Sequence, residues 1–357
     1  MKILLVTSST GWSGGQHQVY LLAKGLKIKG HDVSIVTSTG SELGKRLSSD
    51  GFDVHFLRMN KEADMFSIFR MTGILKTLKP DIINVHRPTA HTIAMISNML
   101  SVRSKFFVTR RVSYGIPSRI SAKIKYEWFV HGVIAISNDV KDSLIRTGVN
   151  EDIISLIPDA VDTDFFNPEH TVPAQGFDNH GTIIGTVGNA NPQKGHRYLI
   201  EAMPAILKNH PEALLVDVGV SDQDIELSGL AKNLDIGDRI IFTGNRQDVR
   251  PYLKAMDIFV FPSLVEGLGT AMLEAMSMKK PVIASRSGGM IDAIDDGRTG
   301  MLIEPASPDE IANAVCRLID NPGYRANLGT NAREAVIKNF SVDVVTEKTL
   351  KLFESVL

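Results

Sequence analysis

Short apolar runs alternate with longer amphipathic segments in the first half of the chain. The apolar runs are typical of buried strands, and the repeating apolar positions between them predict helices. The predicted strands are 3–7, 31–37, 54–57, 82–86, 105–109 and 132–136, and the predicted helices are 16–29, 67–76, 89–100 and 138–147. Strands and helices that alternate in this way predict a doubly wound parallel sheet, an α/β fold.

A second series of the same kind fills the rest of the chain. Its predicted strands are 182–188, 213–218, 239–242, 258–261, 281–284 and 300–302, and its predicted helices lie near 196–208, 223–233, 247–255, 270–278, 308–319 and 323–338. The segment 157–176 is rich in Pro, Asp and Asn and predicts a linker. We therefore expect two Rossmann-like domains, 1–165 and 166–341, and a final helix, 342–357, that could pack on either.

Composition places the chain among ordinary globular proteins. It has 357 residues, of which 43% are hydrophobic and 22% charged. Its single cysteine, Cys316, excludes an internal disulfide and a cysteine-based zinc site, which suits a reducing compartment. No apolar run reaches the roughly 18 residues of a membrane-spanning helix, and the first run is too short for a signal peptide. We expect a cytoplasmic protein.

Charge is distributed unevenly between the two halves. Residues 1–165 hold 21 Lys and Arg against 15 Asp and Glu, a net +6, whereas the rest hold 18 against 25, a net −7. Most of the basic excess falls at Arg103, Lys105, Arg110, Arg111, Arg119, Lys123 and Lys125, with apolar Ile116, Ile120, Ile124 and Trp128 interspersed. This pattern favours an anionic membrane surface as a partner, with the solvated face of an amphipathic helix as the alternative.

Each predicted domain opens with a candidate phosphate loop. Gly14 and Gly15 lie between the first strand and the first helix, where backbone amides can approach an anion, although they could also serve a tight turn. They do not have the G-x-G-x-x-G spacing of a dinucleotide site. In the second domain, Lys194 and Gly195 precede a helix after the loop that begins at Asn189. A lysine at a helix start is unfavourable without an anion, so Lys194 indicates a diphosphate ligand.

Two carboxylates, Glu266 and Glu274, flank a glycine-bearing loop between a strand and a helix. The loop and helix start comprise Gly267, Leu268, Gly269 and Thr270. The glycines allow the backbone to approach a ligand, and the first helical amides favour a phosphate. A nucleotide sugar held by this loop could meet one glutamate at its sugar end and the other at its nucleoside end.

Other polar residues at predicted strand ends leave alternatives open. Arg246 is either a second cation for phosphate, or a lid over the base, or a surface arginine that pairs with Asp248. His86 makes either a structural hydrogen bond or a contact with a substrate. The sequence Asp162-Thr163-Asp164 resembles a metal-binding pair but lies in the predicted linker, where it more readily fixes a hinge. We expect no metal site.

Taken together, these motifs resemble the retaining glycosyltransferases of family 4, also called glycosyl transferases group 1. The matching motifs are Gly14-Gly15, Lys194-Gly195, Glu266-x7-Glu274, Gly288-Gly289 and Gly300 after Asp296-Gly297. The resemblance implies the GT-B fold, two Rossmann-like domains that face across a cleft, with the last helix returning to the first domain. It also implies a UDP- or GDP-sugar donor, bound mainly by the second domain, and no metal or other cofactor. In that family Glu274 would bind the ribose, Glu266 the donor sugar and Lys194 the diphosphate.

Three positions depart from the family pattern. Relatives usually carry Arg at Asn189, so the missing cation would come from Arg246 or from the Arg110-Arg111 pair. Arg111 stands in place of the family histidine and would contact donor sugar or phosphate. The sequence Asp159-Ala160 replaces the usual Asn-Gly of the linker, which predicts a different hinge.

The resemblance implies transfer of a sugar to a lipid-linked or polysaccharide acceptor in cell-envelope glycan synthesis, with no role for nucleic acid. The acceptor side would include His86 and Arg110. An epimerase or hydrolase of the same fold would need a proton-transfer pair near the sugar, and a noncatalytic relative would explain the changes at Asn189 and Arg111. Lys194, Glu266 and Glu274 together favour the transferase. The choice of base and sugar depends on the surroundings of Arg246, Leu264 and Leu268.

Overall fold

The computed structural model describes residues 1–59, 61, 64–113, 119–177 and 181–357. Within it the chain divides into two compact units, which we call unit 1, Met1–Ala160 with Val342–Leu357, and unit 2, Val161–Ser341. The boundary at Ala160 lies slightly before the expected one at residue 165.

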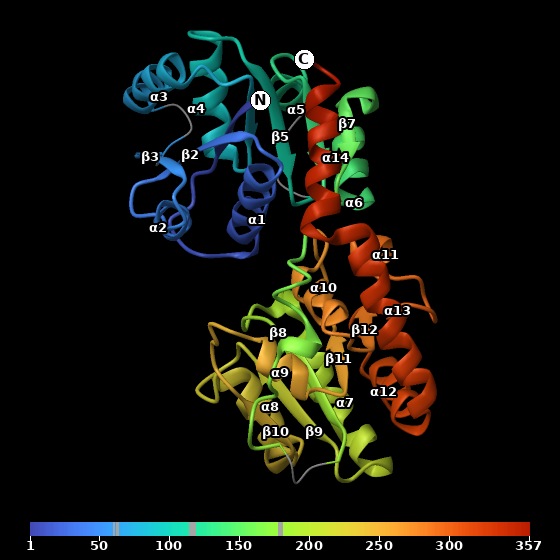
Figure 1. Ribbon diagram of the computed structural model, residues 1–357. Helices are drawn as coiled ribbons and strands as arrows, with labels where there is room; N and C mark the ends of the chain where they lie inside the picture. The colour runs from blue at the N-terminus through green and yellow to red at the C-terminus, as the bar shows by residue number, and fades with distance from the viewer. Residues whose placement is uncertain (60, 62–63, 114–118, 178–180) are drawn as a thin grey trace. The chain divides into compact units, whose positions relative to one another are not determined.

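Unit 1 is built on a seven-stranded parallel sheet with the order β3-β2-β1-β4-β5-β6-β7 (Figure 1). Its strands are nearly continuous apolar runs, as expected for a parallel sheet covered on both faces. They are β1 (Lys2–Val6), β2 (Asp32–Ser38), β3 (Asp53–Leu57), β4 (Ile82–Val85), β5 (Lys105–Arg110), β6 (Gly132–Ala135) and β7 (Ile154–Leu156).

The helices of unit 1 connect these strands and cover the sheet. They are α1 (Gly14–Ile28), α2 (Glu42–Ser49), α3 (Met65–Leu78), α4 (Pro88–Met99), α5 (Arg119–Tyr126), α6 (Asn138–Arg146) and α14 (Val342–Glu354). Helix α14, drawn in red, packs against α1 although it ends the chain (Figure 1). Its Phe353 is fully buried, with its ring centroid 4.8 Å from that of Phe107 in β5, so the last helix completes the core of unit 1.

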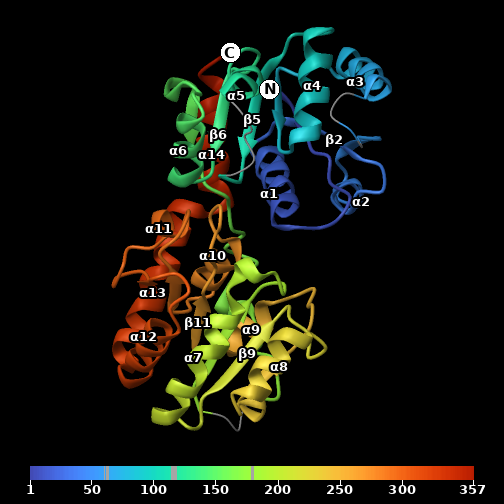
Figure 2. The same cartoon turned by 180° about the vertical axis from the view of Figure 1, so that it is seen from behind.

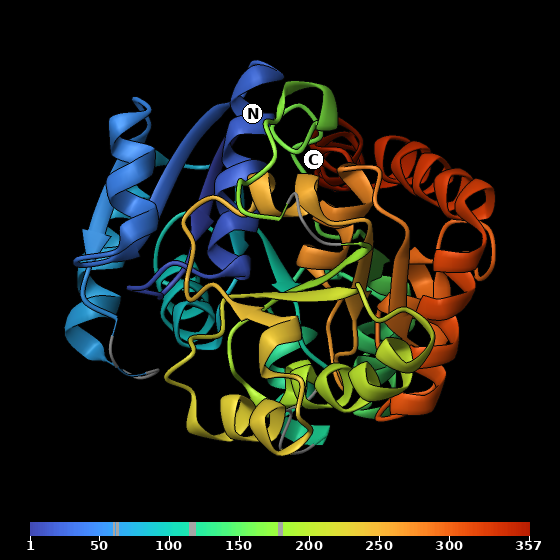
Figure 3. The same ribbon diagram turned by 90° about the horizontal axis from the view of Figure 1, so that it is seen from below.

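Unit 2 repeats this architecture with a six-stranded parallel sheet of order β10-β9-β8-β11-β12-β13 (Figure 2). The strands are β8 (Ile183–Val187), β9 (Leu214–Val218), β10 (Ile240–Phe242), β11 (Ile258–Phe261), β12 (Val282–Ser285) and β13 (Met301–Ile303). The helices are α7 (His196–Asn209), α8 (Ile225–Asn233), α9 (Arg250–Ala255), α10 (Thr270–Ser277), α11 (Met290–Ala293), α12 (Pro308–Asp320) and α13 (Pro322–Phe340). Helices α12 and α13, orange to red, lie side by side (Figure 3).

The expected fold class is confirmed, and the differences from the predicted elements have local causes. Helix α2 was missed because it has few apolar positions; the side chain of Ser41 caps it by accepting a hydrogen bond from the Gly44 amide. Helix α9 begins at Arg250 rather than at 247, because the Asp248 carboxylate accepts the Arg250 amide hydrogen bond.

The segment 157–176 was predicted as a linker, but much of it is packed. Phe166 is only 4% exposed, and its backbone carbonyl accepts hydrogen bonds from the Ser277 hydroxyl and the Arg333 guanidinium. Asp162 fixes a turn by accepting the Phe165 amide hydrogen bond at 2.9 Å. Beyond Ala160 this segment belongs to unit 2.

Strand order reverses once in each sheet, and the reversal points locate the ligand sites that the fold favours. In unit 1, β2 lies on one side of β1 in the sheet and β4 lies on the other side. In unit 2, β9 lies on one side of β8 and β11 lies on the other side. Loops at the carboxyl ends of such strand pairs form the usual binding crevice of open α/β sheets. Gly14 and Gly15 follow β1, His86 follows β4, Lys194 follows β8 and Glu266 follows β11, whereas Arg111 and Arg246 follow β5 and β10.

Candidate functional site

The loops after β8 and β11 are in direct backbone contact in unit 2. The Leu264 amide donates a hydrogen bond to the Gln193 carbonyl at 2.8 Å. Gly195 has a φ of +72°, and a Cβ there would lie 2.0 Å from the carbonyl oxygen of Pro262. Only glycine fits this position, and its contact with Pro262 fixes where the preceding Lys194 lies.

Lys194 and Glu266 meet across these two loops. The Lys194 ammonium forms an ion pair with the Glu266 carboxylate, and the side chains are 31% and 16% exposed. The loop after β12 also supports Glu266, because a Cβ on Gly288 would lie 2.1 Å from the Glu266 carbonyl oxygen. The structure thus brings Lys194, Glu266 and Gly288 together from three loops.

The start of helix α10 presents free backbone amides beside Glu266. Gly269 precedes the helix with a φ of +82° and provides no side-chain cap for the first amides. Leu268, only 1% exposed, anchors the loop, whereas Gly267 and Thr270 remain partly exposed. An uncapped helix start with glycine at its entrance is suited to an anionic ligand.

Glu274 lies farther along the same helix. The residue is half-buried, and burial of its carboxyl raises the pKa to about 8. A carboxyl with such a pKa is largely protonated at neutral pH and can then donate a hydrogen bond as well as accept one. This property suits a group that faces the hydroxyls of a ribose.

Arg246 follows β10 on the exposed side of unit 2. Its guanidinium lies 5.5 Å from the centroid of the Tyr252 ring. The alternative that it pairs with Asp248 is wrong, because the Asp248 carboxylate is bound by Arg250 at 2.7 Å. Arg246 therefore keeps its guanidinium on the surface, where an anion or a base can approach it.

In unit 1, Arg111 is held on two sides just beyond β5. Its Nε donates to Asp159 Oδ1 at 2.9 Å, and its Nη1 donates to His86 Nδ1 at 3.0 Å. Burial, with the charge of Arg111, keeps the pKa of His86 well below its usual value, so the ring is neutral and accepts this bond. Burial also raises the pKa of Asp159, against the opposing effect of Arg111.

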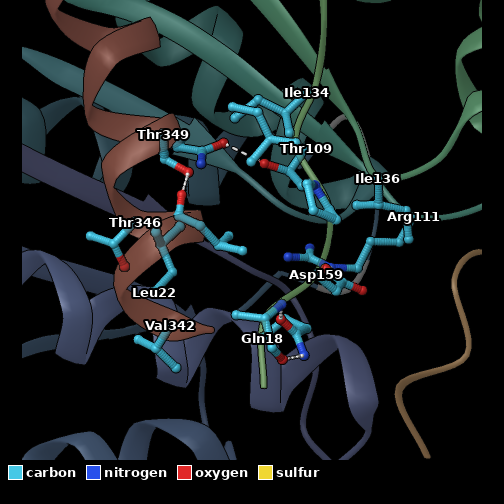
Figure 4. Close-up of a pocket in the computed structure, with 15 residues that line it drawn as sticks. Gln18, Leu22, Thr109, Arg111, Ile134, Ile136, Asp159, Val342, Thr346 and Thr349 are labelled. Carbon is cyan, nitrogen blue, oxygen red and sulfur yellow. Dashed lines mark hydrogen bonds and ion pairs between the residues drawn. The ribbon is translucent and has the colours of Figure 1, made fainter. Parts of the chain in front are cut away.

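A small cavity of about 30 Å³ lies behind this cluster (Figure 4). Gln18, Asn84, Thr109, Arg111 and Asp159 supply much of its polar lining, and α14 closes one side. The Gln18 side chain exchanges two hydrogen bonds with the backbone of Ala160, at 2.8 and 2.7 Å. A cavity of this size has room for a water molecule but not for a substrate.

The remaining residues predicted in unit 1 have different surroundings. Gly14 and Gly15 begin α1, and a Cβ on Gly15 would lie 3.9 Å from the Arg111 side chain, so this glycine adjoins the cluster. Arg110 is buried and donates a hydrogen bond to the Tyr126 hydroxyl at 2.7 Å. Arg110 is thus engaged in packing between β5 and α5.

Two residues that the sequence analysis did not single out adjoin the unit 2 site. His196 is 3% exposed and Asp217 is 1% exposed, and they contact each other directly behind Asn189. One signal for this pair is present in the sequence, an aspartate inside the apolar strand β9. Because a buried charge requires a partner, this aspartate indicates that another polar side chain contacts it. Within the described ranges, no group of three or more His, Cys, Asp and Glu side chains is arranged to hold a metal ion.

Comparison with known proteins identifies the class of protein that this fold and site define. The family model described as glycosyl transferases group 1 matches residues 169–335, and the model described as glycosyltransferase family 4 matches residues 12–165. The two matches divide almost the whole chain between them. The protein belongs to the GT-B glycosyltransferases of this group.

Individual relatives are similar to this chain over most of its length. An uncharacterized glycosyltransferase of Methanocaldococcus jannaschii is 28% identical, covering 93% of this chain and 92% of its own. A UDP-Gal:alpha-D-GlcNAc-diphosphoundecaprenol alpha-1,3-galactosyltransferase of Escherichia coli is 27% identical, covering 81% and 79%. Among solved structures, a glycosyltransferase from Rickettsia africae has a TM-score of 0.88 at 26% identity, covering 99% of this chain and 98% of that one.

The HepE protein of Anabaena, solved in complex with UDP, has the same fold. Its TM-score is 0.87 at 20% identity, with 99% of this chain and 100% of that chain covered. At this identity the likeness concerns the fold alone.

Proposed function

We propose that this protein is a retaining, metal-independent glycosyltransferase that moves a sugar from a UDP- or GDP-sugar to a lipid-linked or polysaccharide acceptor. The observation that carries the proposal is the meeting of Lys194, Glu266 and the uncapped start of α10 at the point where strand order reverses in unit 2. An ammonium, a carboxylate and free amides at one sheet edge match the diphosphate, sugar and phosphate groups of such a donor.

Relatives support the choice of substrates. The E. coli relative is named for a UDP-galactose donor and a diphosphoundecaprenol-linked acceptor, and HepE has been solved with UDP-glucose. A mannosyltransferase of Mycolicibacterium smegmatis, 31% identical over 52% of this chain, is named as GDP-mannose-dependent. The proposal therefore includes both UDP-sugars and GDP-sugars as donors.

The proposed chemistry needs stabilisation of a leaving phosphate. The bond between the anomeric carbon and the β-phosphate oxygen breaks, and its electron pair stays on the phosphate. The acceptor hydroxyl oxygen bonds the anomeric carbon and passes its proton to the departing phosphate. Lys194 and the first amides of α10 stabilise the charge that develops on the β-phosphate. Glu266 orients sugar hydroxyls, and Glu274 binds the ribose. In unit 1, Arg111 with its partners His86 and Asp159 offers a fixed cation to an anionic group of a substrate.

A donor screen tests the proposal directly. We expect one UDP- or GDP-sugar to raise the melting temperature by about 5–10 °C at a concentration 100 times its Kd, because a ligand that binds only the folded state stabilises it by about 2.7 kcal/mol. ADP-sugars are the control. Failure of every UDP- and GDP-sugar to shift the melting temperature would contradict the donor assignment.

Product analysis separates transfer from the other chemistries of this fold. We expect the identified donor to be consumed rapidly only with an acceptor, equally well after treatment with EDTA, and with retention at the anomeric carbon by NMR. Rapid consumption without an acceptor would indicate a hydrolase or epimerase, and binding without turnover across a broad acceptor panel would indicate a noncatalytic protein.

We also propose that unit 1 docks on an anionic membrane through α5. Ile120 and Ile124 lie on α5, and Trp128 lies in the turn that follows it; the three are spaced four residues apart and are 72%, 36% and 62% exposed, whereas Tyr126 is buried. Lys123 and Lys125 lie on the same helix; Ile116 falls outside the described residues. None of the described helices is long and apolar enough to cross a membrane. An exposed apolar stripe with lysines beside it is typical of a helix that lies in the membrane interface.

Sedimentation with vesicles tests the docking surface. We expect binding to phosphatidylglycerol vesicles at low salt, little binding to phosphatidylcholine vesicles, and clear weakening by Trp128→Ser. The matched control is Ile225→Ser, at a 90% exposed isoleucine of unit 2. No sedimentation with anionic vesicles, or equal weakening by both variants, would contradict the proposal.

A further inference from the structure

His196 and Asp217 form a buried pair directly behind the phosphate loop of unit 2. His196 begins α7, and Asp217 lies near the carboxyl end of β9. The His196 Nδ1 is 2.8 Å from Asp217 Oδ2, and the His196 Nε2 is 3.1 Å from the backbone carbonyl oxygen of Asn189. Gly188 makes room for the ring, because a Cβ there would lie 3.0 Å from the same Nε2.

The Asn189 carbonyl determines where one proton of the pair lies. A carbonyl oxygen only accepts, so the Nε2 of His196 must carry a hydrogen and donate it. The other ring nitrogen, Nδ1, then has two possible states. Either Nδ1 carries a hydrogen and donates it to the Asp217 carboxylate, or Nδ1 accepts a hydrogen from a protonated Asp217. Burial raises the pKa of Asp217, against the opposing effect of His196, and its Oδ1 has no hydrogen-bond partner among the described residues. In either state Asp217 keeps the Nε2 hydrogen directed at Asn189.

The bonded carbonyl is the first link in a short chain of turns that ends at Lys194. The Asn191 amide donates to the Asn189 carbonyl at 2.8 Å, and the Lys194 amide donates to the Asn191 carbonyl at 2.8 Å. The Asn191 side chain also accepts the Gln193 amide hydrogen bond at 3.0 Å. Asn189 itself is exposed, so His196 is the buried support at this end of the loop.

We propose that His196, oriented by Asp217, is a positioning residue that holds the loop from Asn189 to Lys194 so that the Lys194 ammonium meets the donor diphosphate. This inference rests on the proposed donor site and adds to it two residues that have no direct contact with the sugar. Lys194 is the single charged residue between Asn189 and Gly195, so this loop contributes its charge through Lys194 alone.

Two substitutions of His196 that differ only in side-chain length test the positioning role. The Gln side chain places its amide near the position of Nε2 and can still donate to Asn189, whereas the shorter Asn amide replaces Nδ1 and reaches only Asp217. We expect His196→Gln to keep the donor KM within about twofold of wild type and His196→Asn to raise it about five- to tenfold, of the order of one lost hydrogen bond. Asp217→Asn, whose amide can donate to Nδ1, should resemble His196→Gln.

A double-mutant cycle shows whether His196 acts through Lys194. We expect His196→Asn to weaken donor binding in the wild type but to have less than about a twofold effect in the Lys194→Ala background. If His196→Asn weakened donor binding by the same factor with and without Lys194→Ala, the proposal would be overturned, since such an independent effect would indicate a general loss of structure. Equal donor KM values for the Gln and Asn variants would also overturn it.

Hydrogen exchange gives a readout that does not depend on catalysis. We expect His196→Asn, but not His196→Gln, to speed exchange of the Asn191 and Lys194 amides at least fivefold, with unchanged exchange in β12. Unchanged exchange at both amides overturns the positioning role even if the enzyme is active. Faster exchange in a protein that binds no nucleotide sugar would support the positioning role and contradict the proposed donor site.

Discussion

The ion pairs of unit 1 and unit 2 lie near the carboxyl ends of parallel strands, but their surroundings differ. In unit 1 the Arg111 and Asp159 side chains are 17% and 7% exposed, and His86 occupies a second nitrogen of the guanidinium. In unit 2 the Lys194 and Glu266 side chains are 31% and 16% exposed. Unit 1 therefore fixes its cation in place, whereas unit 2 holds a cation that an incoming anion can attract.

The chemistry of the two cations fits this difference. A guanidinium offers several donors in one plane and can keep two partners at once, whereas an ammonium is a compact charge on a flexible stem. Breaking a buried pair leaves an uncompensated charge, while a partly exposed pair contributes little to stability. We therefore expect substitutions in the Arg111–Asp159 pair to reduce mainly stability, and substitutions in the Lys194–Glu266 pair to reduce mainly activity.

The largest effect is expected for Asp159→Ala, which leaves Arg111 without its carboxylate. We expect the free energy of unfolding to fall by about 3 kcal/mol, or about 6–12 °C in melting temperature, because a mostly buried cation loses its partner. Asp159→Asn keeps an acceptor and should lose less. A melting temperature for Asp159→Ala within about 2 °C of wild type would show that unit 1 does not depend on this pair.

Lys194→Ala and Glu274→Ala should instead remove activity. We expect each to reduce transfer more than about tenfold, because a preorganised group at the donor is lost, with little change in melting temperature. The matched control is Lys208→Ala, at an exposed lysine of α7. Near-normal turnover in either folded site variant would contradict the donor-site assignment.

A smaller effect, dependent on pH, is expected at Glu274. Its pKa is raised to about 8 from an ordinary 4.5, so the folded state binds the proton more tightly than the unfolded state. The stability from the protonated carboxyl is complete below about pH 4.5 and is lost as the pH rises through about 8. We expect Glu274→Gln to be more stable than wild type by about 1–2 kcal/mol at pH 9, allowing for partial exposure, and nearly equal at pH 5. Thermal unfolding at both pH values checks this, and an equal difference at the two would contradict it.

The smallest change in stability is expected for Glu266→Ala, the counterpart of Asp159→Ala. Loss of this partly exposed pair should change the free energy of unfolding by less than about 1 kcal/mol. Because the variant frees Lys194, the affinity for UDP or GDP should stay equal or increase, while transfer falls. Weaker binding of the free nucleotide would show that Glu266 does not compete with the diphosphate for Lys194.

The sequence predicted the strands and the loops that carry the candidate residues better than it predicted the elements that depend on capping or on distant partners. Lys194 and Glu266 lie in loops that follow β8 and β11, so their meeting at one sheet edge follows from strand order and loop position. The helix α2 and the packed part of the segment 157–176 were not predicted, because their stability depends on capping by Ser41 and on distant partners such as Ser277. Periodicity carries no information on such contacts.

The details within the site could not be read from spacing. Lys194 was expected to need an anion, and a diphosphate was inferred; the structure shows that the Glu266 carboxylate pairs with it, because only the folded loops bring the two together. The bond between His86 and Arg111, and the support of Asn189 by His196, likewise join residues far apart in sequence or hidden in apolar runs. The roles of these residues toward a substrate remain predictions.

Titration calorimetry of UDP and GDP with the wild type and with Lys194→Ala measures whether the loop after β8 binds a diphosphate. We expect one of the two nucleotides to bind the wild type and to lose at least about tenfold in affinity when Lys194 is removed, since a diphosphate then loses its ammonium partner. The Lys208→Ala control should bind like the wild type. Equal affinity for the wild type and Lys194→Ala, or no binding of either nucleotide to the wild type, would contradict the claim that this loop of unit 2 holds the donor diphosphate.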